Sequence, residues 1–385
     1  MKILIFHYDE LDALGGVESL VRTFSREFTQ LGHPTGVVEL GHSGSPKRQL
    51  TPGVPIWKVA GSSFPALTKP RSWFSHARSI SQFRKVVNEF NPDIVHVHFP
   101  VHQALTVVGA CRFPRRWRLA VTVHNSDIRG EPQSDPRIRL WRNRLFDCAD
   151  AITAVSDSLL EEAKQAYPAI GDKGSVIYNG IDADWGEEGQ PSANTPSGKY
   201  VLYAGRLSTV KSVDTLLSAW HSLGRNVEGT TLLIVGDGDE RQALENQARE
   251  LNILDSVTFL PSQGKEALAN LYQNAECVVL PSQREGLAMV LLEAGACGAI
   301  CVASNVTGIY EVIKPGVNGF LFPYGDVAAL TDALKSLFAL SAQERDTLKE
   351  AARKSVAAQF TQQSMLNNYL DLYRGLLGTT TPVDS

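Results

Sequence analysis

The stretch EGLAMVLLE, residues 285–293, sets two carboxylates eight positions apart across a turn that enters an apolar helix. Gly286 can supply a tight turn with positive φ. Residues 287–296 are apolar enough for a core helix, so we expect Glu285 just before the helix and Glu293 about two turns inside it. A carboxylate in so apolar a helix is costly to bury unless donors such as hydroxyls meet it. Because the free amides at a helix start favour phosphate, the stretch predicts a receptor for a nucleotide sugar.

A second motif, YVLYAGRLSTVK, lies upstream at residues 200–211. Residues 200–204 are typical of a strand, and Gly205 of the turn that follows it. Arg206 and Lys211 then place two cations at a strand-to-helix junction. The planar fork of arginine and the point charge of lysine both suit a diphosphate.

Apolar runs alternate with helix-like segments along the whole chain, which indicates parallel sheets covered by helices. We therefore predict an α/β protein with two doubly wound domains, residues 1–183 and 199–364. The Gly-, Pro- and Ser-rich residues 184–198 are expected to form a linker. Ligands bind at the carboxyl ends of the strands in such sheets, so a ligand cleft between the domains is expected. The predicted strands are residues 2–7, 35–40, 54–59, 93–99, 118–124, 151–155, 175–178, 200–204, 231–235, 256–260, 277–280, 300–303 and 319–322.

The ordered set of motifs resembles one known family, the retaining glycosyltransferases of family GT4, which have the GT-B fold. The resemblance spans nearly the whole chain. It implies two Rossmann-like domains that face each other across a deep cleft, the first binding the acceptor and the second the nucleotide-sugar donor. It also implies that the amphipathic C-terminal helix, about residues 365–378, packs back onto the first domain. The matching motifs are Gly15-Gly16-Val17-Glu18, Asn179-Gly180-Ile181-Asp182, Gly205-Arg206 with Lys211, Pro281-Ser282, and Glu285 with Glu293.

Composition is ordinary for a globular protein, with 385 residues of which 43% are apolar and 20% charged. No apolar run approaches the roughly 20 residues of a membrane span, and the N-terminus does not have the pattern of a signal peptide. The five cysteines are odd in number and show no C-x-x-C spacing. Reduced thiols in a cytoplasmic protein are therefore expected.

Charge is distributed unevenly along the chain. Residues 1–183 carry 22 Lys and Arg against 18 Asp and Glu, and the remainder carries 15 against 23. Basic clusters at residues 112–118 and 137–144, and the amphipathic stretch 73–90 with Arg78, Arg84 and Lys85, are compatible with peripheral contact to anionic lipid at the inner face of the plasma membrane. Solvated loops and ordinary helix packing are the alternatives. Nucleic acid is not an expected partner, because no recognition module is present.

Several residues of the first domain are candidates for the site. Gly15 and Gly16 open a helix, where their backbone amides can approach a phosphate or an acceptor hydroxyl. His96 and His98 share a strand face, but we find no third ligand for a metal, and the resembled family needs neither metal nor cofactor. His96 is expected in the core, whereas His98 is a candidate for the cleft, with core packing as its alternative.

His124 ends a predicted strand. In the family a histidine here approaches the transferred sugar, often with an aspartate directly after it. This chain has Asn125 instead, which leaves open whether Asp127 takes that role. Ser156 and residues 179–180 are weaker candidates at comparable strand ends.

In the second domain the resemblance assigns the donor pocket. Gly236 and Gly238 would line the nucleotide, and Leu260 would lie near the base. Gly286, Leu287, Ala288 and Glu311 would bind the donor, although Thr307 stands where the family usually has a second glycine before Gly308.

The resemblance implies transfer of a sugar from a UDP- or GDP-sugar with retained anomeric configuration. Arg206 and Lys211 would hold the diphosphate, Glu285 the sugar hydroxyls and Glu293 the ribose hydroxyls. The acceptor would be a glycan, a polyprenyl-linked glycan or a small molecule, in envelope or exopolysaccharide biosynthesis. It would meet loops 41–53 and 61–72, which carry Lys47, Arg48, Lys69 and Arg71. A non-hydrolysing nucleotide-sugar epimerase and a non-catalytic nucleotide-sugar sensor are the alternatives.

Overall fold

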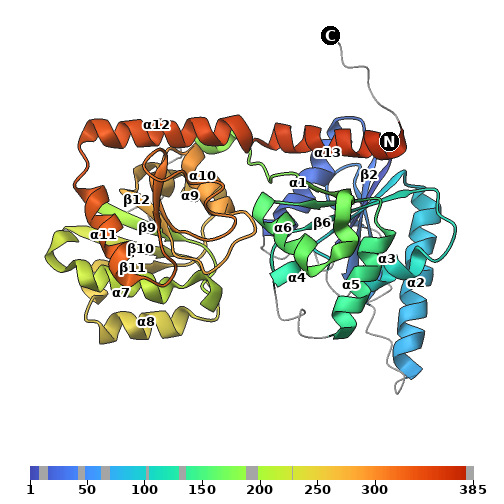
Figure 1. The fold of residues 1–385 in the computed structure, drawn as a ribbon, viewed down its shortest axis with the longest axis horizontal. Helices are drawn as coiled ribbons and strands as arrows, with labels where there is room; N and C mark the ends of the chain where they lie inside the picture. The colour runs from blue at the N-terminus through green and yellow to red at the C-terminus, as the bar shows by residue number, and fades with distance from the viewer. Residues whose placement is uncertain are drawn as a thin grey trace, which may run out of the picture. The chain divides into compact units, whose positions relative to one another are not determined.

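The computed structural model describes residues 1–7, 16–41, 48–61, 70–100, 104–129, 136–187, 198–227 and 229–378. The chain divides into two compact units. The first unit comprises Met1–Ile177 and Leu366–Ser385, and the second comprises Tyr178–Met365. Each unit is a mainly parallel sheet covered by helices (Figure 1).

The sheet of the first unit has the strand order β3-β4-β2-β1-β5-β6-β7-β8. All its pairings are parallel except that of β3 with β4. The seven strands predicted here are confirmed, whereas β3, a two-residue antiparallel edge, was not predicted. The strands are β1 (Ile3–Phe6), β2 (Thr35–Gly41), β3 (Arg48–Gln49), β4 (Pro55–Ala60), β5 (Ile94–His98), β6 (Arg118–Val123), β7 (Ala151–Ala154) and β8 (Gly174–Val176).

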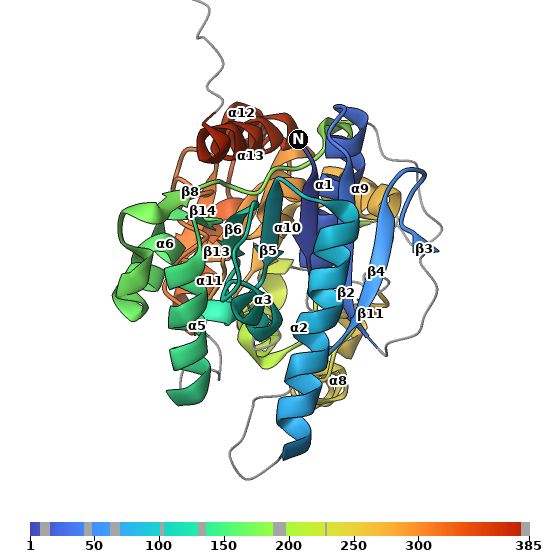
Figure 2. The ribbon, with the colours of Figure 1, turned by 90° about the vertical axis from the view of Figure 1, so that its right-hand side faces the viewer.

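Helices cover both faces of this sheet, and Figure 2 shows α2, α3 and α5 together on one of them. Helix α2 packs on the core through its second half, where Phe83 is fully buried and meets Phe6 edge to face at 5.6 Å between ring centroids. The helices are α1 (Gly16–Gln30), α2 (Pro70–Phe90), α3 (Leu105–Ala110), α4 (Ser126–Arg129), α5 (Pro136–Cys148) and α6 (Asp157–Ala166), with a 3-10 segment η3 (Pro168–Lys173).

The sheet of the second unit is parallel throughout, in the order β11-β10-β9-β12-β13-β14, and all six predicted strands are confirmed. Chain order reverses between β9 and β12, and such a switch point is where open α/β sheets bind ligands. The strands are β9 (Lys199–Ala204), β10 (Thr230–Val235), β11 (Val257–Leu260), β12 (Cys277–Leu280), β13 (Cys301–Ser304) and β14 (Gly319–Phe322). The helices are α7 (Val213–Leu223), α8 (Arg241–Glu250), α9 (Lys265–Asn274), α10 (Met289–Ala296), α11 (Val327–Phe338) and α12 (Ala342–Gln359), with 3-10 segments η4 (Ala183–Gly186), η5 (Thr209–Lys211), η6 (Gly224–Val227) and η7 (Leu254–Ser256).

The C-terminal helix α13 (Gln362–Leu377) contributes two buried tyrosines to the core of the first unit. The Tyr373 hydroxyl lies 2.6 Å from Nδ1 of His96, and Nε2 of His96 lies 2.7 Å from Oγ1 of Thr122. The Tyr369 hydroxyl is also hydrogen-bonded to Thr122, at 3.1 Å. His96 is therefore a core histidine, as predicted, and α13 completes the polar network around it.

Two connecting segments of the second unit run side by side. Ile181 donates its amide to Phe360 and accepts from Gln362, both at 2.9 Å. A Cβ on Gly180 would lie 2.2 Å from the Thr361 carbonyl, so only glycine fits there. Trp185, in the predicted linker, is buried against Tyr272, while residues 188–197 lie outside the described part of the chain.

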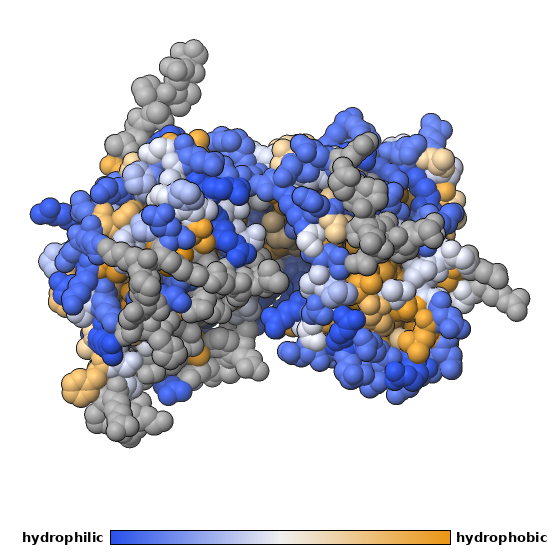
Figure 3. Space-filling view, turned by 180° about the vertical axis from the view of Figure 1, so that it is seen from behind, coloured by the Kyte–Doolittle hydropathy of each residue, from blue (hydrophilic) through white to orange (hydrophobic). Residues whose placement is uncertain are grey.

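Seen from behind, the surface is largely hydrophilic, with hydrophobic residues gathered in patches (Figure 3). Within the described residues, no helix is long and apolar enough to cross a membrane.

Candidate functional site

Three strand-end loops of the second unit are hydrogen-bonded to one another. The Gly205 amide donates to Val235, the Leu207 amide to Asp237, and the Gly236 amide to Leu260, all within 2.9–3.0 Å. These bonds link the loops that follow β9, β10 and β11. A rigid platform is thereby built at the carboxyl edge of the sheet, where a ligand is expected.

The close packing of these loops requires glycine at positions 236 and 238. A Cβ on Gly236 would lie 1.9 Å from the carbonyl oxygen of Gly205, and one on Gly238 would lie 2.1 Å from that of Leu207. Both glycines also have positive φ, at 146° and 157°. Loop crowding alone is therefore sufficient to require glycine at both positions, whether or not a nucleotide binds.

Lys211 and Glu285 meet at the switch point of the second sheet. The Lys211 Nζ donates to Oε1 of Glu285 at 2.5 Å, and only 7% of Glu285 is exposed. The Gln283 amide donates to Val210 at 2.8 Å, which ties together the loops that carry the pair. Burial, with the nearby Glu285 charge, raises the pKa of the Tyr203 hydroxyl. The fold thus brings together into one ion pair two residues that lie 74 positions apart in the sequence.

Arg206 differs from Lys211 in its surroundings. It is exposed, and its guanidinium has no hydrogen-bond or ion-pair partner among the described residues. Tyr203 fixes the backbone here by donating to the Arg206 carbonyl at 2.9 Å. An arginine side chain that follows β9 without a partner is available to an incoming anion.

The turn into α10 differs from the predicted one. Gly286 is not among the residues with positive φ, whereas Gly308, which packs against this turn from the loop after β13, has φ 77°. A Cβ on Gly308 would lie 2.6 Å from the carbonyl oxygens of Glu285 and Gly286. The Ala288 amide donates to the Gly308 carbonyl at 3.3 Å, so one of the two amides predicted for phosphate already has a partner. Leu287 carries the other amide.

Helix α10 begins at Met289, two residues later than predicted, because Ala288 adopts a non-helical conformation at its N-cap. Glu293 therefore lies about one turn inside the helix, not two. It is half-buried, and the Tyr272 hydroxyl donates to its Oε2 at 3.3 Å. Burial raises the pKa of Glu293 to about 7, against the opposing effects of Tyr272 and Lys265. No cation of the described residues pairs with the Glu293 carboxyl, so a further hydrogen-bond donor would stabilise its charged form.

The remaining donor-pocket candidates lie on the same unit. Leu260 is the last residue of β11 and accepts from the Gly236 amide, while half-buried Glu311 follows Gly308 in the loop after β13. Gly308 was not chosen as a site residue from the sequence, although the family pattern of two glycines in this loop pointed to it.

In the first unit, three histidines lie close together beside the β1–β5 switch point. Nδ1 of His98 lies 3.2 Å from Nε2 of His124, and Nε2 of His7 lies 3.4 Å from Oε1 of Glu18. His98 is fully buried, and 7% of His124 is exposed. Burial lowers the pKa of His124 to about 3 and that of His98 well below its usual range, so both rings are neutral at pH 7. The pair of His7 and Glu18 was not singled out from the sequence.

The proton of the His98–His124 hydrogen bond can be assigned. Of two neutral imidazoles, one donates and the other accepts. If His124 donated, His98 would carry its proton on Nε2, which is buried without a partner in the described structure, and a buried unpaired N–H is costly. We therefore assign the donor role to Nδ1 of His98. His124 then carries its proton on Nδ1, and that N–H is what it offers to a ligand.

Asp127 is occupied by its own loop. Its carboxylate accepts the His124 amide at 2.9 Å and the Asn125 amide at 2.7 Å, and it is fully buried. Burial raises the pKa of Asp127, whereas these amides and the Arg142 charge lower it. Asp127 thus orients the loop that carries His124 by accepting its backbone amides.

Other first-domain candidates have structural partners or lie outside the described residues. Ser156 is the N-cap of α6 and accepts from the Leu159 amide at 3.3 Å. Gly16 is the first residue of α1, while Gly15 is outside the described range, as are parts of loops 41–53 and 61–72.

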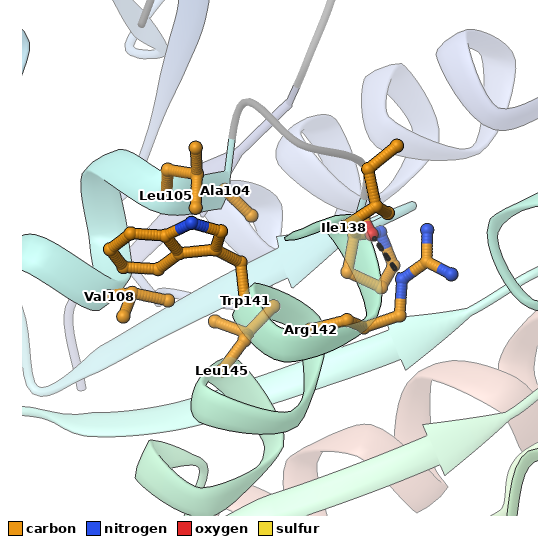
Figure 4. A pocket seen from close by; sticks show the side chains of 8 residues that line it. Ala104, Leu105, Val108, Ile138, Trp141, Arg142 and Leu145 are labelled. Carbon is orange, nitrogen blue, oxygen red and sulfur yellow. Dashed lines mark hydrogen bonds between the residues drawn. The ribbon is translucent and has the colours of Figure 1, made fainter. Parts of the chain in front are cut away.

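A cavity of about 10 Å³ lies between α3 and α5 (Figure 4). Arg142 borders it and is 4% exposed, with Nε donating to Pro100 at 3.3 Å and Nη1 to Tyr167 at 2.8 Å. Its Nη2 has no hydrogen-bond partner among the described residues. No carboxylate of the described residues contacts this guanidinium, which is unusual because a buried charge is normally paired. The cavity is lined by Pro100, Ala104, Leu105, Val108, Ile138, Trp141, Arg142 and Leu145.

No group of His, Cys, Asp and Glu that could hold a metal ion occurs among the described residues.

Two family models together match most of the chain. Residues 14–185 match Glycosyltransferase Family 4, and residues 187–355 match Glycosyl transferases group 1. Over 374 residues the chain is 28% identical to N-acetyl-alpha-D-glucosaminyl L-malate synthase of Bacillus anthracis, with 95% of both chains covered. It is 27% identical to D-inositol 3-phosphate glycosyltransferase of Saccharomonospora viridis, with 86% of this chain and 81% of the relative covered.

Solved structures show the same fold across nearly the full length. Sucrose-phosphate synthase from Thermosynechococcus elongatus superposes with a TM-score of 0.81 at 22% identity, covering 98% of this chain and all of the other. Anabaena HepE in complex with UDP-glucose superposes with a TM-score of 0.79 at 20% identity, covering 97% of this chain and all of the other. The predicted pair of Rossmann-like α/β domains of the GT-B type is confirmed.

Proposed function

The chain belongs to glycosyltransferase family 4, and from this membership we propose that it moves a sugar from a UDP- or GDP-sugar to an acceptor hydroxyl with retention of anomeric configuration. The observation that carries the proposal is the partly buried ion pair of Lys211 and Glu285 at the switch point between β9 and β12. A cation and a hydroxyl-accepting carboxylate in contact match the two halves of a nucleotide sugar, its diphosphate and its sugar. HepE, a fold neighbour, is described with UDP-glucose bound.

The diphosphate would lie between Arg206, Lys211 and the Leu287 amide. As the bond from the anomeric carbon to the phosphate oxygen breaks, negative charge grows on that oxygen, and one preorganised donor contributes roughly 3–4 kcal/mol to stabilising it. The acceptor oxygen attacks the same face, and its proton passes to the departing phosphate. No metal or cofactor is required in this proposal, because the two cations neutralise the leaving group.

The sugar and ribose hydroxyls would meet carboxylates and an imidazole. Glu285 accepts from the sugar hydroxyls while Lys211 turns toward phosphate. Glu293 accepts from ribose hydroxyls, whose donation lowers its raised pKa. His124 would approach the sugar with its Nδ1–H, and Gly16 and Glu311 would line the site.

The acceptor is proposed to carry a phosphate or carboxylate, as a small molecule or a lipid-linked glycan. The two curated relatives are named for L-malate and for D-inositol 3-phosphate. Envelope or exopolysaccharide assembly is the corresponding proposal for the biological role.

Peripheral contact with anionic lipid is proposed for the ends of α2 and α5. Trp73, Phe74 and Leu140 are 50%, 77% and 51% exposed there, and the two helices meet where His76 lies 6.0 Å from the Trp141 ring. Exposed arginines lie on the same two helices, at positions 78, 137, 139 and 144. Aromatic residues among cations suit the interface of a membrane with acidic head groups.

The first experiment is thermal unfolding with UDP-, GDP-, ADP- and TDP-sugars. A ligand at about 100 times its Kd adds about 2.7 kcal/mol, which raises the midpoint by a few degrees. We expect one nucleotide to act, the shift to be lost in Glu293→Ala, and an exposed control, Glu250→Ala, to retain it. Absence of any shift would contradict the proposed donor site.

Turnover then separates the alternatives. Glu285→Ala is expected to retain the nucleotide shift but not to transfer sugar. A new nucleotide sugar formed without acceptor would identify an epimerase, and binding without turnover on any acceptor would identify a sensor.

A further inference from the structure

Tyr272 is buried against the helix that carries Glu293. It lies near the end of α9 with none of its surface exposed, and its hydroxyl donates to Oε2 of Glu293 at 3.3 Å. Burial, with the Glu293 charge, raises the pKa of Tyr272 well above its usual range. The phenol therefore keeps its proton at neutral pH and is available as a hydrogen-bond donor.

The segment η4 fixes the ring of Tyr272 in this position. The Trp185 ring of η4 lies 6.0 Å from the Tyr272 ring between centroids, and the Trp185 carbonyl accepts from Sγ of Cys297 at 2.9 Å. Cys297 follows Glu293 by four positions, so the two side chains lie on the same face of α10. Tyr272 and Trp185 are thus both fastened to that face, and the phenol is held against the carboxyl.

The two oxygens of Glu293 have different surroundings. Oε2 accepts from Tyr272. Oε1 accepts no hydrogen bond from the described residues, and it is not among their fully buried polar atoms without a partner, so solvent reaches it. A carboxylate that is held at one oxygen loses little further freedom when a ligand binds the other.

The charges nearest to Glu293 are arranged around Lys265 of α9. Its positive charge favours the ionised form of Glu293. Lys265 is paired with Asp182 at 2.9 Å and with Asp184 of η4 at 2.5 Å. These charges are therefore balanced within the cluster and favour an ionised Glu293 only through space.

The other titratable groups around α10 keep one charge state near neutral pH. Burial raises the pKa of the Cys297 and Cys301 thiols to about 12, and it also raises that of Cys277. Within the described residues Glu293 is therefore the group of this cluster that titrates near pH 7. The remaining groups are Arg353 of α12, which donates to the Cys297 carbonyl at 3.2 Å, and the pair of Arg345 and Glu276, at 2.9 Å.

We propose that Tyr272 is a positioning residue for the donor, whose hydroxyl holds Oε2 of Glu293 and leaves Oε1 to accept from the ribose hydroxyls of a nucleoside diphosphate sugar. This inference rests on the ribose-binding role proposed above for Glu293. Because the phenol donates to a carboxylate, it also favours the ionised form, which is the form that accepts from ribose hydroxyls. Donor binding near pH 7 then releases a proton from Glu293.

The size of the effect follows from this proton equilibrium. We take the phenol to favour the charged carboxyl about tenfold, which is about 1.4 kcal/mol and near the lower limit for a hydrogen bond to a charged group. About half of the Glu293 carboxyls are then ionised at pH 7 in the wild type, against roughly one in eleven in Tyr272→Phe. Donor affinity of Tyr272→Phe should therefore be about fivefold weaker at pH 7 and within about 1.3-fold of the wild type at pH 8.5.

Calorimetric titration with UDP-glucose, and in a second series with GDP-mannose, measures this loss. Two buffers of different ionisation enthalpy count the protons released, and we expect about 0.5 from the wild type at pH 7 and about 0.9 from Tyr272→Phe. Tyr200→Phe is the matched control, because Tyr200 is a buried tyrosine of the same unit whose hydroxyl donates to the Leu271 carbonyl at 2.8 Å. It should bind and release protons as the wild type does.

Urea unfolding across pH tests the contact without any sugar. Stability of the wild type should fall as pH rises through the folded pKa of Glu293, about 7. In Tyr272→Phe that fall should continue about one pH unit further, since the tenfold preference for the charged form is lost. Tyr200→Phe should follow the wild type.

Several results would overturn the inference. An affinity loss of the same size at pH 7 and pH 8.5 would show that the phenol only supports packing. Wild-type affinity in Tyr272→Phe at pH 7, or an unfolding profile that ends at the same pH in both proteins, would show that the phenol does not act on Glu293. If neither probe binds the wild type, the proposed function fails and this inference fails with it, whereas donor binding without the pH-dependent loss refutes this inference alone.

Discussion

Substitution of Gly308 by alanine isolates the contact that holds the Glu285 loop in place. Gly308 has φ 77°, and its Cβ would lie 2.6 Å from the carbonyl oxygens of Glu285 and Gly286. Gly316 is the matched control, since it has φ 73° on the same unit and nothing lies within 4 Å of its Cβ position. Both substitutions place alanine in the left-handed region and so cause the same backbone strain. Only Gly308→Ala also brings the Cβ against carbonyl oxygens, those of Glu285 and Gly286.

The structure gives the size of the two effects. An alanine in the left-handed region destabilises by roughly 1–2 kcal/mol, which is the loss expected for Gly316→Ala. Gly308→Ala should lose a further 1–3 kcal/mol or so, because the Glu285–Gly286 backbone must move aside. If Glu285 then loses one hydrogen bond to the sugar, worth about 1.5–3 kcal/mol, donor affinity falls about 10- to 100-fold.

Urea unfolding and donor titration measure both quantities. Gly316→Ala is expected to bind the donor as the wild type does. If Gly308→Ala matched Gly316→Ala in stability and the wild type in donor affinity, neither the crowding at Gly308 nor the role of Glu285 could stand.

Three further predictions concern other sites. Glu293 has a folded pKa of about 7 against an ordinary 4.5, so the folded protein binds its proton more tightly and stability should fall between about pH 4.5 and 7, by on the order of 1–3 kcal/mol. Urea unfolding of Glu293→Gln should lack that slope, and an unchanged slope would contradict the assignment. Asp127→Asn should lose about 1–2 kcal/mol, because one amide acceptor in the loop of His124 is removed, and equal urea midpoints would contradict this. Serine at both Trp73 and Phe74 should release the protein from acidic vesicles in a sedimentation assay, whereas unchanged binding would move the contact elsewhere.

The strands were predictable because buried parallel strands are continuous apolar runs that need no partner to be recognised. Helix α10 shows the limit of local patterns. Residues 287–288 are as apolar as the helix that follows, yet the Ala288 amide donates to Gly308, twenty positions along the chain, and the helix begins only at Met289. A two-residue strand such as β3 carries too little pattern to be seen.

The site was predictable by motif and less so by geometry. Glu285 and Lys211 were chosen as separate ligand contacts, and the structure adds that they form an ion pair. The pairing of His98 with His124 depends on which elements lie side by side in the fold. Spacing along the chain does not encode this contact, because the two residues lie 26 positions apart.

The network between α13 and His96 sets the order in which the protein can be completed on the ribosome. Residues 1–177 of the first unit are synthesised before the second unit, but the buried Tyr369 and Tyr373 of the same first unit are synthesised after it. At about 5–20 residues per second, the 188 residues from Tyr178 to Met365 take roughly ten to forty seconds to emerge. During that time the first unit waits with His96 and Thr122 lacking their tyrosine partners. The unit made second is therefore the first that can finish folding, and a nascent chain stalled before Tyr369 would present an unfinished N-terminal core to chaperones.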